Sequence, residues 1–271
     1  MSEETSLYEV VDKVSVITMN RPDKLNSLNA ALKDSLTKNF ARAEEDPNTS
    51  VVLLRGAGRS FCAGYDLSGD PDAAERKGDA IKTHAHLSKS IKFATTPWNL
   101  RKPVIAAVKG HALGFGCQLA MFCDLTVASD NAKFGEPESR FGGTGPGFVM
   151  RWMIGFKKAR ELTYFGDTID AEEALRLGMI NRILPTEGFE EAALKYAKRL
   201  TLIAPEALVM TKLAINRGAD ASGFMSAMQG AVDVVAPLYA ATTEVGTKFK
   251  EISQTQGVAA AVKWRRAQFE E

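Results

Sequence analysis

Two glycine-containing segments are the parts of this sequence that could bring the main chain close to a ligand. The first, residues 56–67, directly follows an apolar run at 51–54, and the second, residues 110–120, directly follows an apolar run at 104–108. Glycine has no Cβ, so the backbone at such a turn can approach a bound molecule closely. Neither segment is a phosphate loop, because the Lys-Ser/Thr ending and the third glycine of the dinucleotide fingerprint are absent. Taken alone, each segment also suits an ordinary strand-to-helix turn.

A glutamate held beside a proline could act as a positioned base. Glu138 follows Pro137 and precedes a glycine-rich stretch at 142–147 that leads into a helix. A carboxylate held against a substrate can accept and return a proton. Glu136, two residues earlier, is a second candidate, whose direction the intervening proline leaves open. Solvated loop glutamates are commoner than catalytic ones, so this motif needs its context.

The elements around these segments indicate an α/β core. The runs at 51–54 and 104–108 are apolar throughout, which is typical of strands buried on both faces, and residues 14–19 form an alternating, β-branched strand. Between the first two strands an apolar residue recurs every four positions from Leu28 to Phe40, which predicts a helix with one apolar stripe. Strand and helix alternate again after residue 104, and such alternation favours an α/β fold.

The chain changes character after about residue 186. Asp170 to Glu173 resembles a capping box, Gly178 suits the end of the following helix, and 179–184 reads as a short strand. Helical patterns alone then cover residues 192–202, 207–216, 224–243 and 259–269. We therefore expect an α/β core over residues 1–195 and a helical C-terminal unit over 196–271.

Composition excludes several classes of protein. The 34 Lys and Arg balance 33 Asp and Glu, a net charge of +1, which makes a nucleic-acid partner unattractive. With 45% apolar and 25% charged residues the chain suits a packed, soluble domain. The charge-free stretch at 110–123 is shorter than the roughly 18 apolar residues of a membrane span, so no membrane partner is expected.

The cysteines and histidines do not suggest a metal site. Cys62, Cys117 and Cys123 stand in apolar surroundings, which favours buried reduced thiols over disulfides or a zinc site. His84 and His86 have no cluster of carboxylates or thiols near them in the sequence. No leader sequence is visible at the N-terminus, so we expect a cytoplasmic protein with no bound metal.

The order, spacing and types of the three segments resemble the crotonase family, the enoyl-CoA hydratase/isomerase group. Asn20-Arg21-Pro22 with Leu25–Asn29, Lys102–Val108, and Asp167–Ala174 add to the resemblance, which covers roughly residues 8–190. It implies a crotonase-type spiral of ββα units with a helical C-terminal oligomerisation unit. It also implies an acyl-CoA thioester as partner, no cofactor beyond the CoA of the substrate, and a homotrimer or homohexamer.

The resemblance assigns two main-chain donors. A thioester carbonyl that becomes an enolate develops negative charge on its oxygen, and N–H groups already aimed at that oxygen stabilise the charge. By motif position the donors are the N–H groups of Tyr65 and Phe115. Phe115 stands where the family commonly has glycine, which leaves the donor in place because the group is main chain. Phe115 also begins the helix that continues to Cys123, so the helix dipole adds to the stabilisation.

The resemblance also assigns the acid and base. In the hydratases of the family two glutamates face the substrate double bond; Glu138 matches one of them, and Gln118 stands at the position of the other. An amide can orient water or substrate but cannot accept a proton. Removing one general acid or base costs about 10²–10⁴ in rate. Glu136 is the nearest residue that could replace the missing carboxyl.

A single carboxylate predicts an isomerase, because a 1,3-proton shift needs one base that takes a proton at one carbon and returns it at another. We therefore expect proton transfer on an unsaturated acyl-CoA through a thioester enolate, with an enoyl-CoA hydratase that uses Glu138 and a water positioned by Gln118 as the alternative. Other acyl-CoA hydrolases or decarboxylases of the family, a non-catalytic module that binds CoA or RNA, and a serine peptidase with a distantly similar core remain open. A peptidase would need a serine after Gly114-Phe115-Gly116, and none follows.

The remaining site residues are expected to bind the substrate. In the first segment these are Ala63, Gly64 and Asp66, and in the second they are Gly114 and Gly116. Lys24 falls where the N-terminal loop of the family approaches the CoA phosphates, and Arg59 could serve the same end. Arg140 could tune the pKa of Glu138 or reach solvent.

Overall fold

Six strands form the central sheet of the computed structural model, which describes residues 4–69, 72–145, 148–241 and 243–269. Their order across the sheet is β1 (Ser6–Val11), β2 (Val14–Met19), β3 (Val51–Gly56), β4 (Val104–Val108), β6 (Leu125–Ser129) and β9 (Arg182–Leu184). Strand β1 is antiparallel to β2, and every other neighbouring pair is parallel. The expected α/β core is confirmed, although the strand predicted over 179–184 is shorter because Asn181 forms the turn before it, its N–H bonded to Thr126.

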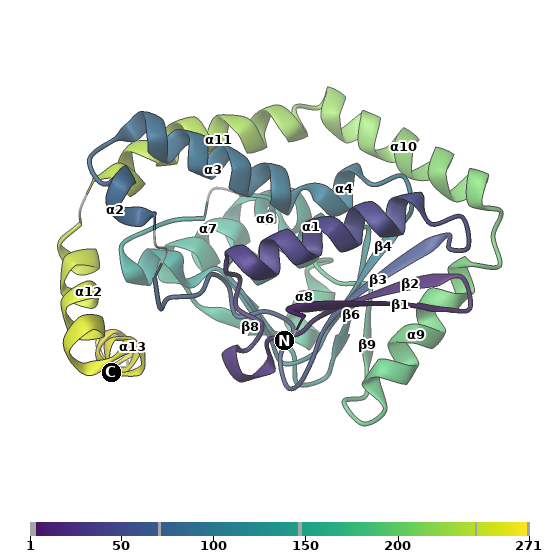
Figure 1. Ribbon diagram of the computed structural model, residues 1–271, viewed down its shortest axis with the longest axis horizontal. Helices are drawn as coiled ribbons and strands as arrows, with labels where there is room; N and C mark the ends of the chain where they lie inside the picture. Colours follow the sequence, from purple (N-terminus) through teal and green to yellow (C-terminus); the bar gives the residue numbers. More distant parts are fainter. Residues whose placement is uncertain (1–3, 70–71, 146–147, 242, 270–271) are drawn as a thin grey trace.

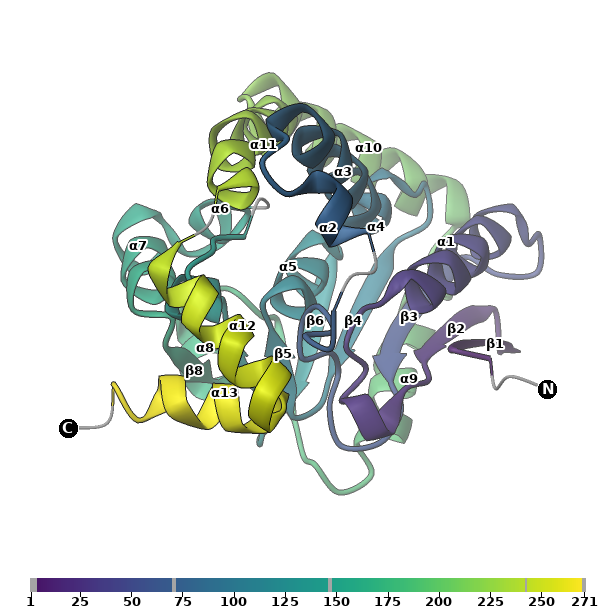
Figure 2. The ribbon, with the colours of Figure 1, turned by 60° about the vertical axis from the view of Figure 1, so that its left-hand side comes forward.

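The apolar runs are buried on both faces, as predicted. On one face Val52 and Leu54 pack in the cluster that includes helix α1 (Ala30–Glu45), and on the other Val51 and Leu53 pack with helix α9 (Phe189–Leu200). Figure 2 shows α1 above these strands and α9 below them. Because successive strand residues point to opposite faces, a strand between two helical layers must be apolar throughout.

Helix α1 begins two residues later than the apolar stripe predicts. Its N-cap is Asn29, whose side chain accepts a hydrogen bond of 2.9 Å from the Leu32 N–H. Leu28, the first residue of the stripe, lies outside the helix in an extended bridge to Tyr65. The rest of the stripe is confirmed, because Leu32, Leu36 and Phe40 are all buried.

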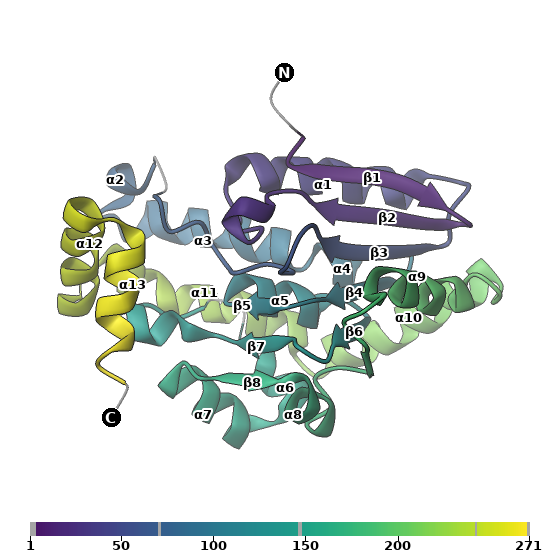
Figure 3. The same ribbon diagram turned by 90° about the horizontal axis from the view of Figure 1, so that it is seen from below.

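A second, smaller sheet carries the segments of interest. It consists of β5 (His111–Leu113), β7 (Lys133–Gly135) and β8 (Thr168–Asp170), in that order. Strands β5 and β7 are parallel, with Ala112 opposite Phe134. Each then leads directly into a predicted site segment, so the pairing carries both segments to the same edge (Figure 3). The sequence pattern did not predict this sheet, because strands of three residues are too short for a period of two to be visible.

Thirteen α-helices and two 3-10 helices complete the described part of the chain. Besides α1 and α9 they are η1 (Pro22–Lys24), α2 (Ala73–Arg76), α3 (Ala80–Ala94), α4 (Thr96–Asn99), α5 (Phe115–Phe122), η2 (Pro137–Phe141), α6 (Met150–Ile154), α7 (Phe156–Phe165), α8 (Ala171–Arg176), α10 (Pro205–Ala221), α11 (Phe224–Ala240), α12 (Glu244–Gln256) and α13 (Val258–Arg266). Within the described ranges no helix is long and apolar enough to cross a bilayer.

The C-terminal part of the chain is helical from α9 onward, as predicted. Helix α11 ends at Ala240 rather than at residue 243, and α12 follows it, where no helix was expected. Helices α12 and α13 form the end of the molecule opposite α10 (Figures 1 and 3). The expected domain boundary after residue 195 falls within α9, and the division into a core and a helical unit remains a proposal.

Candidate active site

The two glycine segments run side by side. Cys62 in the first and Ala112 in the second form a parallel bridge, in which the Cys62 N–H donates to the His111 carbonyl and the Leu113 N–H donates to the Cys62 carbonyl, both at 3.0 Å. A Cβ on Gly116 would come 2.2 Å from the Cys62 carbonyl oxygen. Glycine is therefore required at 116 for the two segments to meet.

The predicted donors, Tyr65 and Phe115, each lie three residues beyond this bridge. A second parallel bridge joins Leu28 and Tyr65. In it the Leu28 N–H donates to the Gly64 carbonyl, and the Asp66 N–H donates to the Leu28 carbonyl. In a parallel bridge the paired residue, here Tyr65, directs its own N–H to the other side. Phe115 is the first residue of α5, where N–H groups have no intrahelical acceptor. Across the described residues neither N–H has a hydrogen-bond acceptor, so both are available to a ligand.

The two donors are close to each other. A Cβ on Gly64 would lie 3.8 Å from the Phe115 nitrogen and 3.1 Å from the Leu113 carbonyl oxygen. The rings of Tyr65 and Phe115 have centroids 5.1 Å apart, and the Phe115 ring also stacks on Phe93. The Phe115 side chain is thus buried between aromatic neighbours.

Gly114 brings the predicted base to the same place. Its φ is +54°, and its N–H donates to the Gly135 carbonyl at 2.8 Å. A Cβ on Gly114 would lie 2.7 Å from Oε1 of Glu138, so the carboxyl group packs against the residue directly before Phe115. The structure therefore brings together Glu138 and the Phe115 N–H, which the sequence predicts as members of one site.

Glu138 lies in η2, which follows β7. Pro137 begins this 3-10 turn and Gly142 ends it in the left-handed conformation. Oε2 of Glu138 is out of contact with solvent and has no hydrogen-bond partner within the described residues. Burial raises the pKa of Glu138 to about 7. A carboxyl group with this pKa exchanges protons readily near neutral pH.

Gln118 and Glu136 form a second polar group beside the first. Both are buried, with 2% and 1% of their surface exposed. A Cβ on Gly145 would come 2.2 Å from Nε2 of Gln118 and 3.3 Å from Oε2 of Glu136. Burial and the charge of Glu138 raise the pKa of Glu136 well above its usual value, and the Gln118 amide opposes this rise. Neither carboxyl oxygen of Glu136 has a partner of good hydrogen-bond geometry among the described residues.

Tyr239 is a site residue that the sequence analysis missed. It lies near the end of α11, and its hydroxyl donates to the Thr144 carbonyl at 2.5 Å. A Cβ on Gly143 would lie 3.3 Å from the Tyr239 hydroxyl oxygen and 3.8 Å from the Glu138 carbonyl oxygen. Partial burial and the charge of Glu138 raise the pKa of this phenol. No sequence signal identifies it, because only the packing of α11 brings residue 239 to residue 138.

The N-terminal loop that carries Lys24 is hydrogen-bonded to the first glycine segment. The Ala63 N–H donates to the carbonyl of Leu25 at 3.0 Å. Lys24, the residue before Leu25, is exposed. Asp66 pairs with Arg21 at 2.9 Å and accepts hydrogen bonds from Ser68. Asp66 therefore holds the loop in shape.

Among the described residues, neither Arg140 nor His111 forms a hydrogen bond or an ion pair with the Glu138 carboxyl group. Arg140 donates to the Phe165 carbonyl and to Asp167, and its guanidinium lies over the Phe269 ring. Nδ1 of His111 lies 3.3 Å from Oγ of Ser60. Burial lowers the pKa of His111, and nearby cations, among them Arg59, lower it further.

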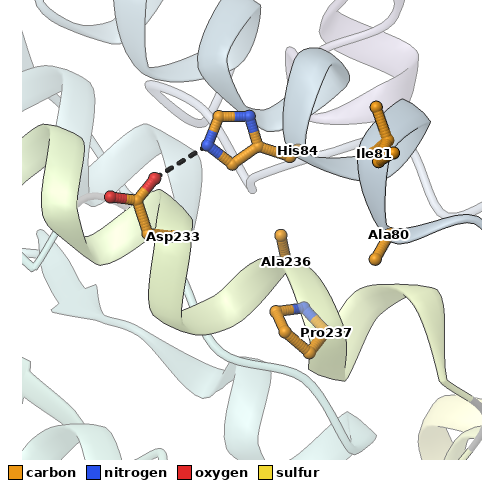
Figure 4. A pocket seen from close by; sticks show the side chains of 6 residues that line it. All are labelled: Ala80, Ile81, His84, Asp233, Ala236 and Pro237. Atoms are coloured by element: carbon orange, nitrogen blue, oxygen red, sulfur yellow. Dashed lines mark hydrogen bonds and ion pairs between the residues drawn. The ribbon is translucent and has the colours of Figure 1, made fainter.

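The three thiols are buried, and His84 lies away from this arrangement. The prediction of buried, unpaired cysteines is confirmed for Cys62, Cys117 and Cys123. Nε2 of His84 lies 2.7 Å from Oδ1 of Asp233 in a pocket between α3 and α11 that contains no residue of the glycine segments (Figure 4). The described residues contain no group of three or more His, Cys, Asp or Glu that could hold a metal ion.

The pKa of Glu138 predicts a pH-dependent contribution to stability. Its pKa is higher in the folded chain than its ordinary value of 4.5, so the folded state binds more protons than the unfolded state up to about pH 7. The free energy of unfolding should therefore fall as pH rises from about 4.5 to about 7, and more steeply in the wild type than in Glu138→Gln. Urea unfolding at a series of pH values measures this difference, and parallel curves for the two proteins would contradict it.

The chain is similar to known proteins over most of its length. Residues 9–256 match the family described as enoyl-CoA hydratase/isomerase. The chain is 36% identical over 229 residues to a probable enoyl-CoA hydratase of Mycobacterium bovis, covering 82% of this chain and 85% of the relative. It is 37% identical over 217 residues to the short-chain-enoyl-CoA hydratase of Clostridium acetobutylicum, covering 78% and 81%. The crystal structure of an enoyl-CoA hydratase/isomerase from Xanthobacter autotrophicus Py2 superposes with a TM-score of 0.93 at 32% identity, over 98% of this chain and 99% of the other.

Proposed function

The chain belongs to the enoyl-CoA hydratase/isomerase family, the crotonases, and we propose that it adds water across the double bond of a 2-enoyl-CoA thioester. The observation that supports this most is the packing of the Glu138 carboxyl against Gly114, directly before the Phe115 N–H. Two relatives are named as hydratases, which favours hydration over the isomerisation expected from Gln118.

The first role of the site is to hold the thioester oxygen. As the double bond reacts, negative charge moves to this oxygen, and we assign the Tyr65 and Phe115 N–H groups as the donors that stabilise it. Because α5 begins at Phe115, the partial positive charge of its N-terminus acts on the same oxygen. Removing one such donor typically raises the barrier by about 2.7–4 kcal/mol.

The second role is to activate water. Ionised Glu138 takes a proton from a water molecule as the water oxygen bonds to C3 of the acyl chain. The electron pair of the double bond moves toward the thioester and forms the enolate. The amide of Gln118 is suited to orient the water or the substrate. A proton delivered to C2 then completes a 3-hydroxyacyl-CoA.

Cations around His111, in the second glycine segment, support CoA as the carrier. Arg59, Lys133 and Arg266 all act on His111, so three positive side chains gather around one residue. A Cβ on Gly58 would lie 2.8 Å from Cβ of Pro22, so the segment before Arg59 packs against η1, which carries Lys24. Phosphate groups of CoA are the ligand that such a group of cations would attract.

Replacing Arg59 by alanine should weaken acyl-CoA binding without changing the chemical step. The expected effect is a KM about 5-fold higher, which corresponds to ~1 kcal/mol, with kcat unchanged and with a smaller effect at high salt. Steady-state kinetics at two ionic strengths measure it. Arg199→Ala, at an exposed arginine on α9, is the control, and equal KM values for the two variants would contradict the assignment.

Isomerisation of a 3-enoyl-CoA is the second candidate, because Gln118 carries no group that can accept a proton and Glu138 alone could move a proton between two carbons. Purified protein should be given a 2-enoyl-CoA and a 3-enoyl-CoA, with water addition and double-bond migration followed separately. Faster hydration supports our proposal. Faster migration would restore the isomerase, and inertness toward both would favour the other acyl-CoA reactions or a binding module.

We propose further that the chain forms a homotrimer or a homohexamer in the cytoplasm. Helix α7 exposes Phe156, Tyr164 and Phe165, by 58%, 71% and 58%, and exposed aromatic side chains of this kind are suited to a protein interface. Light scattering after size-exclusion chromatography measures the mass, and a monomer at micromolar concentration would contradict this part of the proposal.

A further inference from the structure

Glu136 is a buried acid that the mechanism above leaves without a task. It is 1% exposed, and neither oxygen has a well-formed hydrogen bond within the described residues. An isolated carboxylate is very costly to bury, so such a group is held neutral. A neutral carboxyl group then carries an O–H donor that needs an acceptor. Native proteins rarely leave a buried donor unpaired, so the missing acceptor is expected to be a water or a ligand.

Among the described residues, the groups that shift the pKa of Glu136 include no cation. Besides burial, the charge of Glu138 in η2 raises the pKa of Glu136, and the amide of Gln118 in α5 lowers it. The Cys117 thiol of α5 and the Tyr239 phenol of α11 also respond to its charge. All four are neutral or acidic side chains, so the surroundings favour the protonated form of Glu136.

The position of Glu136 relative to Glu138 suits a pair of acids with a substrate between them. Glu138 packs against Gly114, and Glu136 lies beside Gln118, four residues further along α5. Residues four apart share one face of a helix and are separated by about 6 Å along its axis. The Glu138 carboxyl group therefore lies at the N-cap of α5, and the Glu136 carboxyl group lies beside its first turn.

We propose that Glu136 is the second acid of this site, a neutral carboxyl group that delivers the proton to C2 of the enolate. This rests on the proposed hydration. Glu138 receives a proton from water as the C3–O bond forms, and the O–H bond of Glu136 breaks as the C2–H bond forms. The electron pair of the enolate makes the C2–H bond, and the thioester carbonyl is restored. Glu138 returns its proton to Glu136 through a water molecule after the product leaves, so the net reaction adds one water.

Glu136→Gln should separate the two reactions of the site. The amide keeps the size and burial of the side chain but has no acidic proton, so hydration of a 2-enoyl-CoA should fall about 100-fold. Migration of the double bond in a 3-enoyl-CoA needs only Glu138 and should stay within a few-fold of its wild-type rate. Hydration at the wild-type rate, or an equal loss of both reactions, would overturn the inference.

Moving the carboxyl group back to the helix provides a second variant. Gln118 and Glu136 are neighbours, so the double variant Gln118→Glu with Glu136→Gln exchanges the two side chains. The same pair of groups, one amide and one carboxyl, then remains beside Gly145. We expect it to recover most of the hydration lost in Glu136→Gln. No recovery in a folded exchange variant would count against an acid role. Glu172→Gln, at an exposed residue of α8, controls for the loss of a glutamate elsewhere.

Two readouts do not depend on comparing variant rates. The hydration rate of the wild type should decrease at high pH, where Glu136 loses its proton, and this decrease should be absent in Glu136→Gln. Infrared difference spectra should show the C=O band of a protonated carboxyl group at neutral pH, lost in Glu136→Gln. If that band is absent, the inference about Glu136 is wrong, whether or not the protein hydrates a 2-enoyl-CoA. If the band is present but the protein has no hydratase activity, the proposed hydration is wrong and the protonated Glu136 remains.

Discussion

Glu138→Gln is expected to lower kcat/KM for hydration of a 2-enoyl-CoA by about 10²–10⁴, the usual effect of removing a general base. The amide keeps the shape of the side chain against Gly114, so the fold and the thioester site should persist. The same variant should lose double-bond migration in a 3-enoyl-CoA, because both reactions use this carboxyl group. Steady-state kinetics with each substrate measure the loss.

Binding must be measured beside the rates. The Kd of a 3-hydroxyacyl-CoA, determined by calorimetry, should change little in Glu138→Gln, because the Tyr65 and Phe115 N–H groups remain. Glu172→Gln should match the wild type in both rate and Kd. A Glu138→Gln protein that hydrates at the wild-type rate would move the base to another residue.

Gly114→Ala is the second large effect that we expect. A methyl group at this position would lie 2.7 Å from Oε1 of Glu138, and the backbone φ of +54° with ψ of −123° is one that side chains avoid. Both effects displace the carboxyl group and the Phe115 N–H that follows. Loss of one such N–H donor costs about 10²–10³ in kcat, and we expect a decrease of this size.

Gly178→Ala is the matched control for backbone strain. Gly178 also has a positive φ, +78°, but a Cβ there would meet nothing within 4 Å. Both variants should lose stability in a thermal melt, and only Gly114→Ala should lose activity. If Gly114→Ala and Gly178→Ala lost activity equally, backbone strain alone would explain the loss. The contact between position 114 and Glu138 would then have no role in it.

The sequence allowed the central sheet to be predicted because burial on two faces leaves a simple pattern. Strands β3 and β4 are apolar throughout, and the stripe of α1 continues over Leu32, Leu36 and Phe40. The stripe also includes Leu28, which is buried by its bridge to Tyr65 rather than by a helix. Periodicity reports that a residue is buried, and it does not report which element buries it.

The site was predictable where it is made of main chain. The resemblance to the crotonase family assigned the Tyr65 and Phe115 N–H groups to one site, and the Cys62–Ala112 bridge brings their two segments together. Glu136 was left open because Pro137 obscured its direction. Phe134 is buried in β7, and alternation along an extended chain from Phe134 would have turned Glu136 to the same buried side.

The expectation of an isomerase came from counting carboxyl groups by motif position alone. Gln118 lowers that count to one, but a side chain from another element, Glu136, lies beside it. The sequence separates these two residues by 18 positions, and no periodicity connects α5 to the segment after β7. Tyr239 was missed for the same reason, because its hydrogen bond to Thr144 arises only when the end of α11 reaches the segment after η2.

A crystal structure with a bound 3-hydroxyacyl-CoA tests the central claim most directly. We predict that the thioester oxygen lies about 2.7–3.1 Å from both the Tyr65 and the Phe115 nitrogen, with the Glu138 carboxyl group in hydrogen-bond contact with the 3-hydroxyl group. A thioester oxygen bound elsewhere, or a Glu138 side chain directed away from C2 and C3, would contradict the account.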